Sequence, residues 1–266
     1  MEVKILGTGG FENEGLPFNS FLVDGHLLVE TPPDILQSLR RENVDLAEID
    51  TIVITHFHGD HCFGLPFLLF NLYLTRSARL GELRASPLKL IAPFGLRDWM
   101  KTILGLAISP GHPYVEWSIS ALDSAEIGEG ERMDVAGGLW LDFYKAEHSP
   151  ETYSVLVGRG EGQEPLLIAT SDTKWSPRLA TLLARGGRLV LCDSGGKGND
   201  DADTETEVGP NGESWASEVH MSPAEIEARV LPLLRPDTRL VATHFSADPP
   251  RTGTLSFAKC GDVYRI

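Results

Sequence analysis

The sequence predicts an α/β protein in which two mixed β-sheets pack face to face and helices cover them on the outside. Apolar, β-branched segments of strand length alternate with helical patterns, and a run of short strand patterns with glycine turns occupies the middle of the chain. The 266 residues are 42% hydrophobic, which is ample for a sizeable core, and nothing in the sequence requires a domain boundary. We therefore expect a single domain over residues 1–266, arranged as a four-layer αββα sandwich.

The N-terminal part is expected to contain a strand, a hairpin, a helix and a helical turn before the next strand. Asp24-Gly25 lies between two apolar segments and is the strongest short hairpin pattern in the chain. His26 belongs to this hairpin, and because it stands apart from the other histidines we expect a structural role for it. Pro32 and Pro33 can open the following helix, since proline is tolerated in a first turn. These elements are expected at residues 3–6, 20–23, 26–29, 32–41, 46–49 and 51–55.

Three histidines and one aspartate directly follow the strand pattern of residues 51–55. His56 and His58 alternate along an extended backbone, so their imidazoles project to the same side and can close on one metal ion. The histidines of such a cluster would repel one another if protonated, and burying the cluster does not stabilise the protein unless a cation is bound. The pattern therefore predicts a metal site formed by His56, His58, Asp60 and His61.

A helix is expected to begin at this cluster. Gly59 allows the chain to bend sharply, and apolar residues then recur with helical spacing. Adjacent residues at a helix start diverge, so Asp60 and His61 need not reach the ion of the two preceding histidines, and a second ion is the natural partner. Cys62 lies about 100° around the helix axis from His61, and packing is its expected role.

The middle of the chain is expected to change from helices to strands. A strand is predicted at residues 88–92, a helix at 95–106 and a succession of short strands over 115–157. His112 lies between glycine and proline in a predicted loop, where we expect it at the surface.

Four later candidate residues also follow strand patterns, and loops at strand ends converge in folds of this class. His148 is either a metal ligand or a solvated loop residue. Asp172 is either a ligand or a helix cap, although it precedes the helix near Pro177 by five residues. The strand patterns at residues 139–145, 166–169, 188–192 and 239–243 lead to His148, Asp172, Asp193 and His244.

One further histidine stands just before a helix start. His220 precedes Ser222, a predicted N-cap, with Pro223 in the first turn and Glu225 at the capping-box position. From the residues alone His220 could be a plain loop residue.

Several of these segments resemble a known family. His-Phe-His-Gly-Asp-His at residues 56–61 resembles the His-x-His-x-Asp-His signature of the metallo-β-lactamase-fold hydrolases. Leu-Ile-Ala-Pro-Phe-Gly-Leu at 90–96, His-Met-Ser at 220–222 and Thr-His-Phe-Ser at 243–246 are similar to segments of its transfer-RNA 3′-processing and phosphodiesterase branch. The resemblance extends over the whole chain and implies the metallo-β-lactamase fold and a metal-dependent hydrolase.

The resemblance also implies roles for the candidate residues. One divalent ion would be held by His56, His58 and His148, a second by Asp60, His61 and His244, with Asp172 bridging them. Zinc is the expected metal, and manganese or iron would also suit the ligands. A metal-bridging hydroxide would attack a phosphodiester, and His220 oriented by Asp193 would protonate the leaving oxygen. The expected catalytic residues are Asp60, His220 and Asp193.

The substrate is expected to be small. The transfer-RNA processing enzymes carry a long Gly/Pro-rich arm between their third and fourth motifs, whereas only about two dozen residues separate His148 from Asp172. A net charge of -15, a pI near 4.9 and the lack of a Lys/Arg cluster disfavour a long nucleic acid. A small phosphodiester or a cyclic nucleotide is the better expectation. A lactone or β-lactam hydrolase, an iron oxidoreductase and a non-catalytic accessory protein of cofactor biosynthesis remain alternatives.

The remaining composition bears on environment and mobility. Residues 199–218 are rich in Asp and Glu without Lys or Arg, which predicts a mobile acidic loop or a lid. The three cysteines, Cys62, Cys192 and Cys260, are widely spaced and suit a reducing compartment. With no targeting pattern at the N-terminus and no apolar run of membrane-spanning length, we expect a cytoplasmic protein without a membrane partner. The oligomeric state stays open, with a homodimer as one possibility.

Overall fold

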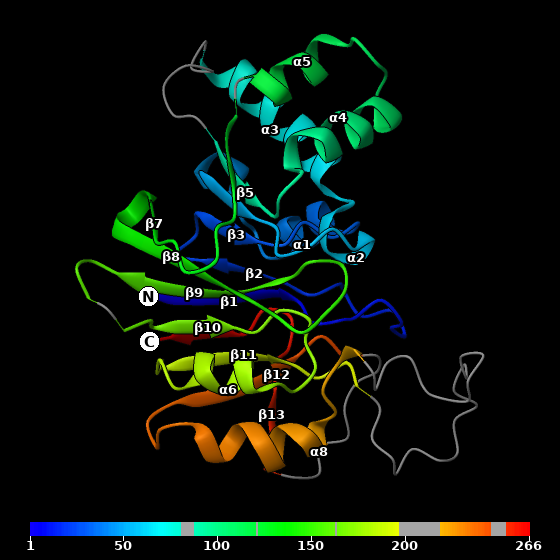
Figure 1. Ribbon diagram of the computed structural model, residues 1–266. Helices are drawn as coiled ribbons and strands as arrows, with labels where there is room; N and C mark the ends of the chain where they lie inside the picture. Colours follow the sequence, from blue (N-terminus) through cyan, green and yellow to red (C-terminus); the bar gives the residue numbers. More distant parts are fainter. Residues whose placement is uncertain (81–87, 121, 163, 197–218, 246–253) are drawn as a thin grey trace. The chain divides into compact units, whose positions relative to one another are not determined.

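The computed structural model describes residues 1–80, 88–120, 122–162, 164–196, 219–245 and 254–266 (Figure 1). The chain forms two compact units, the first comprising residues 1–7, 17–128 and 260–265 and the second residues 8–16, 129–259 and 266. The acidic segment 199–218 lies outside the described residues. The single domain expected over residues 1–266 stays a prediction.

The first unit contains a seven-stranded mixed sheet. In spatial order its strands are β14 (Val263–Arg265), β1 (Glu2–Gly7), β2 (Ser20–Val23), β3 (Leu27–Val29), β4 (Thr51–Val53), β5 (Lys89–Ala92) and β6 (Asp123–Glu126). Pairing is antiparallel from β14 to β3 and parallel from β3 to β6. Asp24 and Gly25 have φ of 48° and 79°, as a type I′ turn requires, so the predicted hairpin is confirmed. His26 has a structural partner, since its Nδ1 lies 3.1 Å from Oδ1 of Asp50.

Over its described residues, the first unit contains the helices α1 (Ile35–Arg41), the 3₁₀ turn η1 (Leu46–Glu48), α2 (Gly59–Cys62), α3 (Leu65–Leu80), α4 (Leu96–Ala107) and α5 (Pro113–Ser120). One correction concerns α1, which begins after its N-cap Asp34, so Pro32 and Pro33 precede the helix and do not form its first turn. Apolar side chains of α1 and α3 bury one core with those of β4 and β5.

The helix α5 is a second correction, because its residues were expected to begin a run of strands. Its Val, Trp and Ile residues favour a strand by composition, but tertiary packing can override this intrinsic propensity. The rings of Tyr114 and Trp117, one helical turn apart, both contact Tyr73 on α3, and the Tyr114 hydroxyl donates to the carbonyl of Pro66. His112 is exposed, as predicted, and its Nδ1 accepts a hydrogen bond from the Tyr114 N–H at the start of the helix.

The second unit contains another seven-stranded mixed sheet. In spatial order its strands are β13 (Ser256–Phe257), β12 (Arg239–Thr243), β11 (Leu189–Asp193), β10 (Leu167–Ala169), β9 (Tyr153–Arg159), β8 (Leu139–Lys145) and β7 (Met133–Val135). Pairing is parallel from β13 to β10 and antiparallel from β10 to β7. The strand ends of β8, β10, β11 and β12 lead to the four candidate residues predicted there.

In the described part of the second unit, the α-helices are α6 (Pro177–Leu183) and α8 (Pro223–Glu225). The predicted capping box of Ser222 and Glu225 is confirmed, with each side chain bonded to the backbone N–H of the other residue. The segment continues as a π-helical turn, η3 (Ile226–Val230), and a 3₁₀ turn, η4 (Leu231–Leu233), where Pro232 has no N–H to continue an α-helical pattern.

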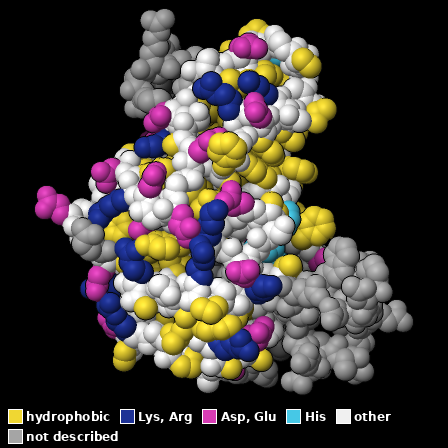
Figure 2. Space-filling model, viewed as in Figure 1, with side chains coloured by type: hydrophobic (Ala, Val, Ile, Leu, Met, Phe, Trp, Pro, Cys, Tyr) yellow, Lys and Arg dark blue, Asp and Glu magenta, His cyan; other side chains and the backbone are white. Residues whose placement is uncertain are grey.

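The surface carries both signs of charge. Figure 2 shows Lys and Arg side chains interspersed with Asp and Glu side chains over the visible face. Several cations of the second unit are paired with acids, among them Arg178 with Glu129 and Arg235 with Glu164. Among the described residues, no helix combines the length and the apolar character needed to cross a membrane.

Candidate active site

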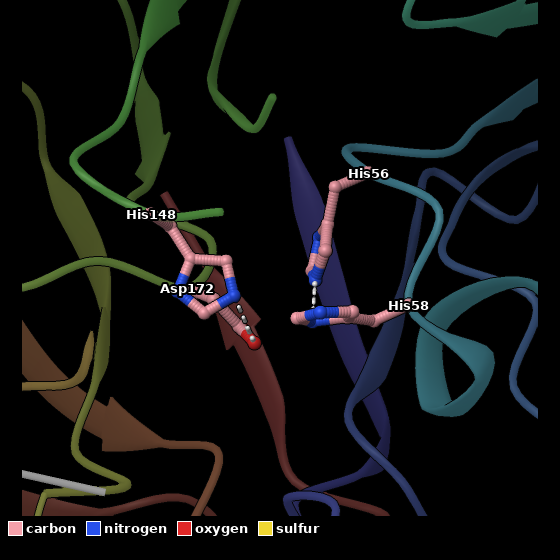
Figure 3. Close-up of side chains that lie close together, drawn as sticks. All are labelled: His56, His58, His148 and Asp172. Atoms are coloured by element: carbon pink, nitrogen blue, oxygen red, sulfur yellow. Dashed lines mark hydrogen bonds and ion pairs between the residues drawn. The ribbon is translucent and has the colours of Figure 1, made fainter. Parts of the chain in front are cut away.

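The first group of candidate residues lies beyond the end of β4. The chain continues the sheet past Val53, because Ile54 N–H donates to the carbonyl of Ile91 at 2.9 Å. His56 is fully buried, and its Nε2 lies 3.2 Å from Nδ1 of the partly buried His58 (Figure 3). The two imidazoles therefore point toward one another, as their alternation along the chain predicts.

Asp60 and His61 join this group from the single turn of α2. Nε2 of His61 lies 3.4 Å from Oδ2 of Asp60, and its ring centroid lies 4.2 Å from that of His56. Both residues are buried. Cys62 packs in the core, and its Sγ donates to the carbonyl of His58. The four residues predicted from this segment thus form one cluster within the first unit.

Sequence reasoning missed Glu30, the buried residue that follows β3. One carboxylate oxygen accepts a hydrogen bond from the Thr55 hydroxyl and lies 3.4 Å from Nδ1 of His61, and the other accepts from the Thr55 N–H. The Thr55 hydroxyl also lies 3.0 Å from Nδ1 of His56. When this hydroxyl donates to Glu30 it accepts from His56 Nδ1–H, which leaves Nε2 of His56 as the ligand atom.

The second group of candidate residues belongs to the second unit. His148, in the loop between β8 and β9, has its Nε2 3.9 Å from Oδ2 of Asp172 (Figure 3). The same carboxylate oxygen lies 3.4 Å from Nε2 of His244. Asp172 does not cap α6, because the N-cap is Ser176, whose side chain accepts from the Leu179 N–H. The capping alternative for Asp172 is therefore excluded.

Asp193 orients two histidines at once. Its Oδ2 lies 2.7 Å from Nδ1 of His220, and its Oδ1 lies 3.2 Å from Nδ1 of His244. Backbone N–H groups of Thr173 and Gly195 each donate to one of these oxygens, at 2.9 and 3.0 Å. Both histidines therefore carry Nδ1–H toward Asp193 and present Nε2 on the other side of the ring.

These contacts set the charges of the pair. Burial alone would raise the pKa of Asp193, but the charges and hydrogen bonds of His220 and His244 lower it below its usual value. Burial alone would lower the pKa of His220, but the charge and hydrogen bond of Asp193 raise it. The geometry favours an imidazolium at His220 beside a carboxylate at Asp193.

Two glycines leave room for His244. A Cβ placed on Gly10 or on Gly195 would lie 3.1 Å from atoms of the His244 ring. His244 itself has a φ of 58°, in the left-handed region that residues other than glycine rarely adopt. Gly10 N–H donates to the carbonyl of Phe245, and Phe245 N–H to that of Thr8, which holds the N-terminal glycine segment against the strand end.

The donor sets of both units suit divalent metal ions. Ligand atoms of Glu30, His56 and His61 in the first unit lie within 4.8 Å of one another, as do those of Asp172, Asp193, His220 and His244 in the second. Imidazole and carboxylate donors in buried positions are the ligands of zinc, iron and manganese sites. In the second set both oxygens of Asp193 already accept hydrogen bonds, so Asp172 and His244 are the better ligands.

Comparison with known proteins identifies a matching family and several relatives of this chain. A family model described as "Anti-Pycsar protein Apyc1" matches residues 1–195. Ribonuclease BN of Cronobacter sakazakii is 37% identical over 168 residues, which cover 59% of this chain and 49% of that protein. Ribonuclease Z of Geobacillus kaustophilus is 34% identical over 120 residues, covering 45% and 34% respectively. The chain thus matches less than half the length of these two relatives.

Solved structures agree on the fold. The short form of human tRNase Z gives a TM-score of 0.69 at 19% identity, with 100% of this chain and 99% of that one covered. The metallo-β-lactamase-fold protein YhfI from Bacillus subtilis gives 0.71 at 16%, covering 99% and 98%. A diphosphatase of the PhnP family gives 0.69 at 17%, covering 100% and 97%. The predicted αββα metallo-β-lactamase fold is confirmed. With a match over 195 of its 266 residues, the chain belongs to the family of the Anti-Pycsar protein Apyc1, and its relatives include ribonucleases of the transfer-RNA 3′-processing branch.

Proposed function

We propose that this protein is a metal-dependent phosphodiesterase that acts on a small phosphodiester, such as a cyclic nucleotide. The observation that carries the proposal is the Asp193–His220 pair, which lies in the same unit as the metal-type residues Asp172 and His244. An imidazole fixed by a carboxylate beside such residues suits protonation of a leaving oxygen. The names of the relatives, ribonucleases and a diphosphatase, support a substrate with a phosphoryl group.

The residues that would hold two divalent ions follow from the family motifs. We assign His56, His58 and His148 to one ion, Asp60, His61 and His244 to the other, and Asp172 to both. When bound, the ions would supply Lewis acidity at the phosphoryl group and lower the pKa of a coordinated water. Zinc is the metal we propose, and the imidazole and carboxylate donors of both sets would also suit manganese or iron.

His220 would act on the leaving group. Its Nδ1–H is held by Asp193, so its Nε2 carries the second proton of the imidazolium. Because Asp193 raises the pKa of His220, that proton is retained to higher pH than on a free imidazole. Transfer of the proton from Nε2 to the departing alkoxide would leave a neutral imidazole, which Asp193 keeps in place for the next cycle.

The charge of the protein favours a small substrate. A net charge of -15 repels a polyanion over long distances, whereas two divalent ions would create a local cationic site that one phosphodiester can reach. The interspersed Lys and Arg side chains of Figure 2 do not form a continuous track on that face for a nucleic-acid backbone.

A hydrolysis panel on protein of defined metal content tests the proposal. The panel contains cyclic nucleotides, a linear dinucleotide, phosphomonoesters, lactones and β-lactams. We expect turnover of phosphodiesters by the wild type, loss of turnover in His58→Ala, and unchanged turnover in His112→Ala, whose exposed histidine lies outside both clusters. Turnover of lactones or β-lactams alone would refute a phosphodiesterase, and metal binding without any turnover would favour an accessory protein.

A further inference from the structure

Two exposed aromatic side chains lie on the segment that carries the first cluster. Phe63 directly follows α2 with a helical backbone, and its N–H donates to the carbonyl of Gly59 at 3.0 Å. Phe67 lies four residues further along, on α3. Their exposed fractions are 50% and 52%, whereas Cys62 and Leu65 beside them are buried in the core. The core-facing side of this segment is therefore filled, and the two rings lie on its outer side.

The ring of Phe63 rests against the backbone of the metal-binding segment. A Cβ placed on Gly59 would lie 2.9 Å from Cδ2 and Cε2 of Phe63, so the absence of a side chain at Gly59 gives the ring its place. Side chains on a helix lean toward its N-terminus, which is where His58 caps α2 and Asp60 lies in its first turn. One part of the ring is thus fixed by the backbone between two proposed ligands, and the rest faces solvent.

An exposed aromatic surface in this place has a chemical use. Phe63 caps the end of α2 and Phe67 lies in the first turns of α3, so one short segment carries both exposed rings. A phenyl ring stacks on planar aromatic groups, and every nucleobase has a π-face. A neutral ring also does not compete with metal ions for a phosphate group.

We propose that Phe63 is the surface on which the base of a nucleotide substrate stacks, with Phe67 extending that surface. This inference rests on the proposed phosphodiesterase function and assigns the residue that would bind the base. Stacking does not read the hydrogen-bonding edge of a base, so purines and pyrimidines are both accepted. The base contributes to binding, while the metal-type residues of the same segment act on the phosphate.

Steady-state kinetics with two matched substrates test this assignment. One is a nucleoside 3′,5′-cyclic phosphate, and the other is the same ribose cyclic phosphate with a methoxy group in place of the base. Phe63→Ala should raise KM for the nucleotide about 5- to 150-fold with little change in kcat, and leave the abasic substrate unaffected. Phe63→Tyr should restore nucleotide binding. Phe94→Ala is the control, because Phe94 is 79% exposed in the same unit, in the loop before α4.

Equal losses on both substrates, or a loss in kcat and metal content, would show that Phe63 is structural and would overturn the assignment. A second measurement separates this failure from failure of the proposed function. If the wild type cleaves no phosphodiester, calorimetric titration with a nucleoside 5′-monophosphate and with ribose 5-phosphate still reports stacking. If the wild type binds the nucleotide more tightly than ribose 5-phosphate and Phe63→Ala loses this difference, base stacking on Phe63 is supported. Equal binding of the two ligands by the wild type refutes it.

Discussion

The Nδ1 atom of His220 lies 2.7 Å from Oδ2 of Asp193, and the side chains of both residues are largely buried. The other oxygen of the same carboxylate contacts His244, a proposed metal ligand. A single buried carboxylate therefore connects the proposed proton donor with the proposed metal site. Substitutions at His220 and at Asp193 should for this reason have separable effects.

Replacement of His220 should affect the chemistry of the leaving group without affecting metal content. We expect His220→Ala to lower kcat roughly 10²- to 10⁴-fold for a substrate with an alkoxide leaving group, because proton donation is lost. With a nitrophenolate leaving group the loss should be much smaller, since this oxygen needs little protonation. The measurement compares kcat for the two ester types at equal metal occupancy. Similar losses for both types would assign His220 to binding or structure.

Replacement of Asp193 should disturb both histidines. In Asp193→Asn one oxygen becomes an NH₂ group, which cannot accept a hydrogen bond from Nδ1–H or from a backbone N–H. Because Asp193 raises the pKa of His220, the fall of kcat at alkaline pH should move to lower pH in this variant. Metal affinity should also fall, by about 10- to 100-fold, because the orientation of His244 is lost. A pH profile and a chelator competition check the two effects, and an unchanged metal affinity would show that the contact with His244 is dispensable.

Many of the candidate residues that the structure brings together could be identified because they follow strands. His56, Asp172 and His244 lie just after short apolar segments of strand length, and His148 follows a segment with the alternating pattern of a strand. Loops at strand ends converge in folds of this class, so polar residues in these positions are candidates for a common site. Which atoms face one another could not be predicted, because that depends on contacts between segments distant in the chain.

The strand expected in place of α5 and the failure to identify Glu30 also come from contacts between segments that are distant in the chain. α5 was expected as strand because its residues favour strand locally, whereas in the structure its aromatic rings pack as a helix against Tyr73 of α3. Glu30 was missed because a single carboxylate after a short strand is common, and its relation to Thr55 depends on the parallel pairing of β3 with β4. Its position directly after Val29 was the one available indication, since the other candidate residues follow strands in the same way.

Metal stoichiometry separates a dinuclear from a mononuclear site. We expect two divalent ions per chain in the wild type, because the proposed ligands exceed what one tetrahedral zinc can use. His244→Ala should lose mainly one equivalent, since His56, His58 and His148 would still hold the other ion. Elemental analysis after dialysis against a metal-buffered solution gives the count. A wild type that binds a single ion at full occupancy, and a variant that keeps it, would contradict the dinuclear assignment.

Glu30 gives the last prediction, because it contacts proposed ligands without being one of them. Glu30→Gln keeps the size of the side chain but replaces one acceptor oxygen by a donor. The Thr55 N–H on one oxygen, and the Thr55 hydroxyl and His61 on the other, can then no longer all be satisfied. Ligand orientation should then relax, and metal affinity should fall about 10- to 100-fold. The matched control is Asp50→Asn, which alters another carboxylate–histidine pair of the same unit, that with His26, and should leave metal affinity unchanged. Thr55→Val should weaken metal binding in the same direction as Glu30→Gln, because the hydroxyl joins Glu30 to His56. Chelator competition measures all three variants, and thermal unfolding of the metal-free proteins shows whether the fold itself has changed. A loss in Glu30→Gln that is matched by Asp50→Asn would trace the effect to general destabilisation, and would remove Glu30 from the metal site.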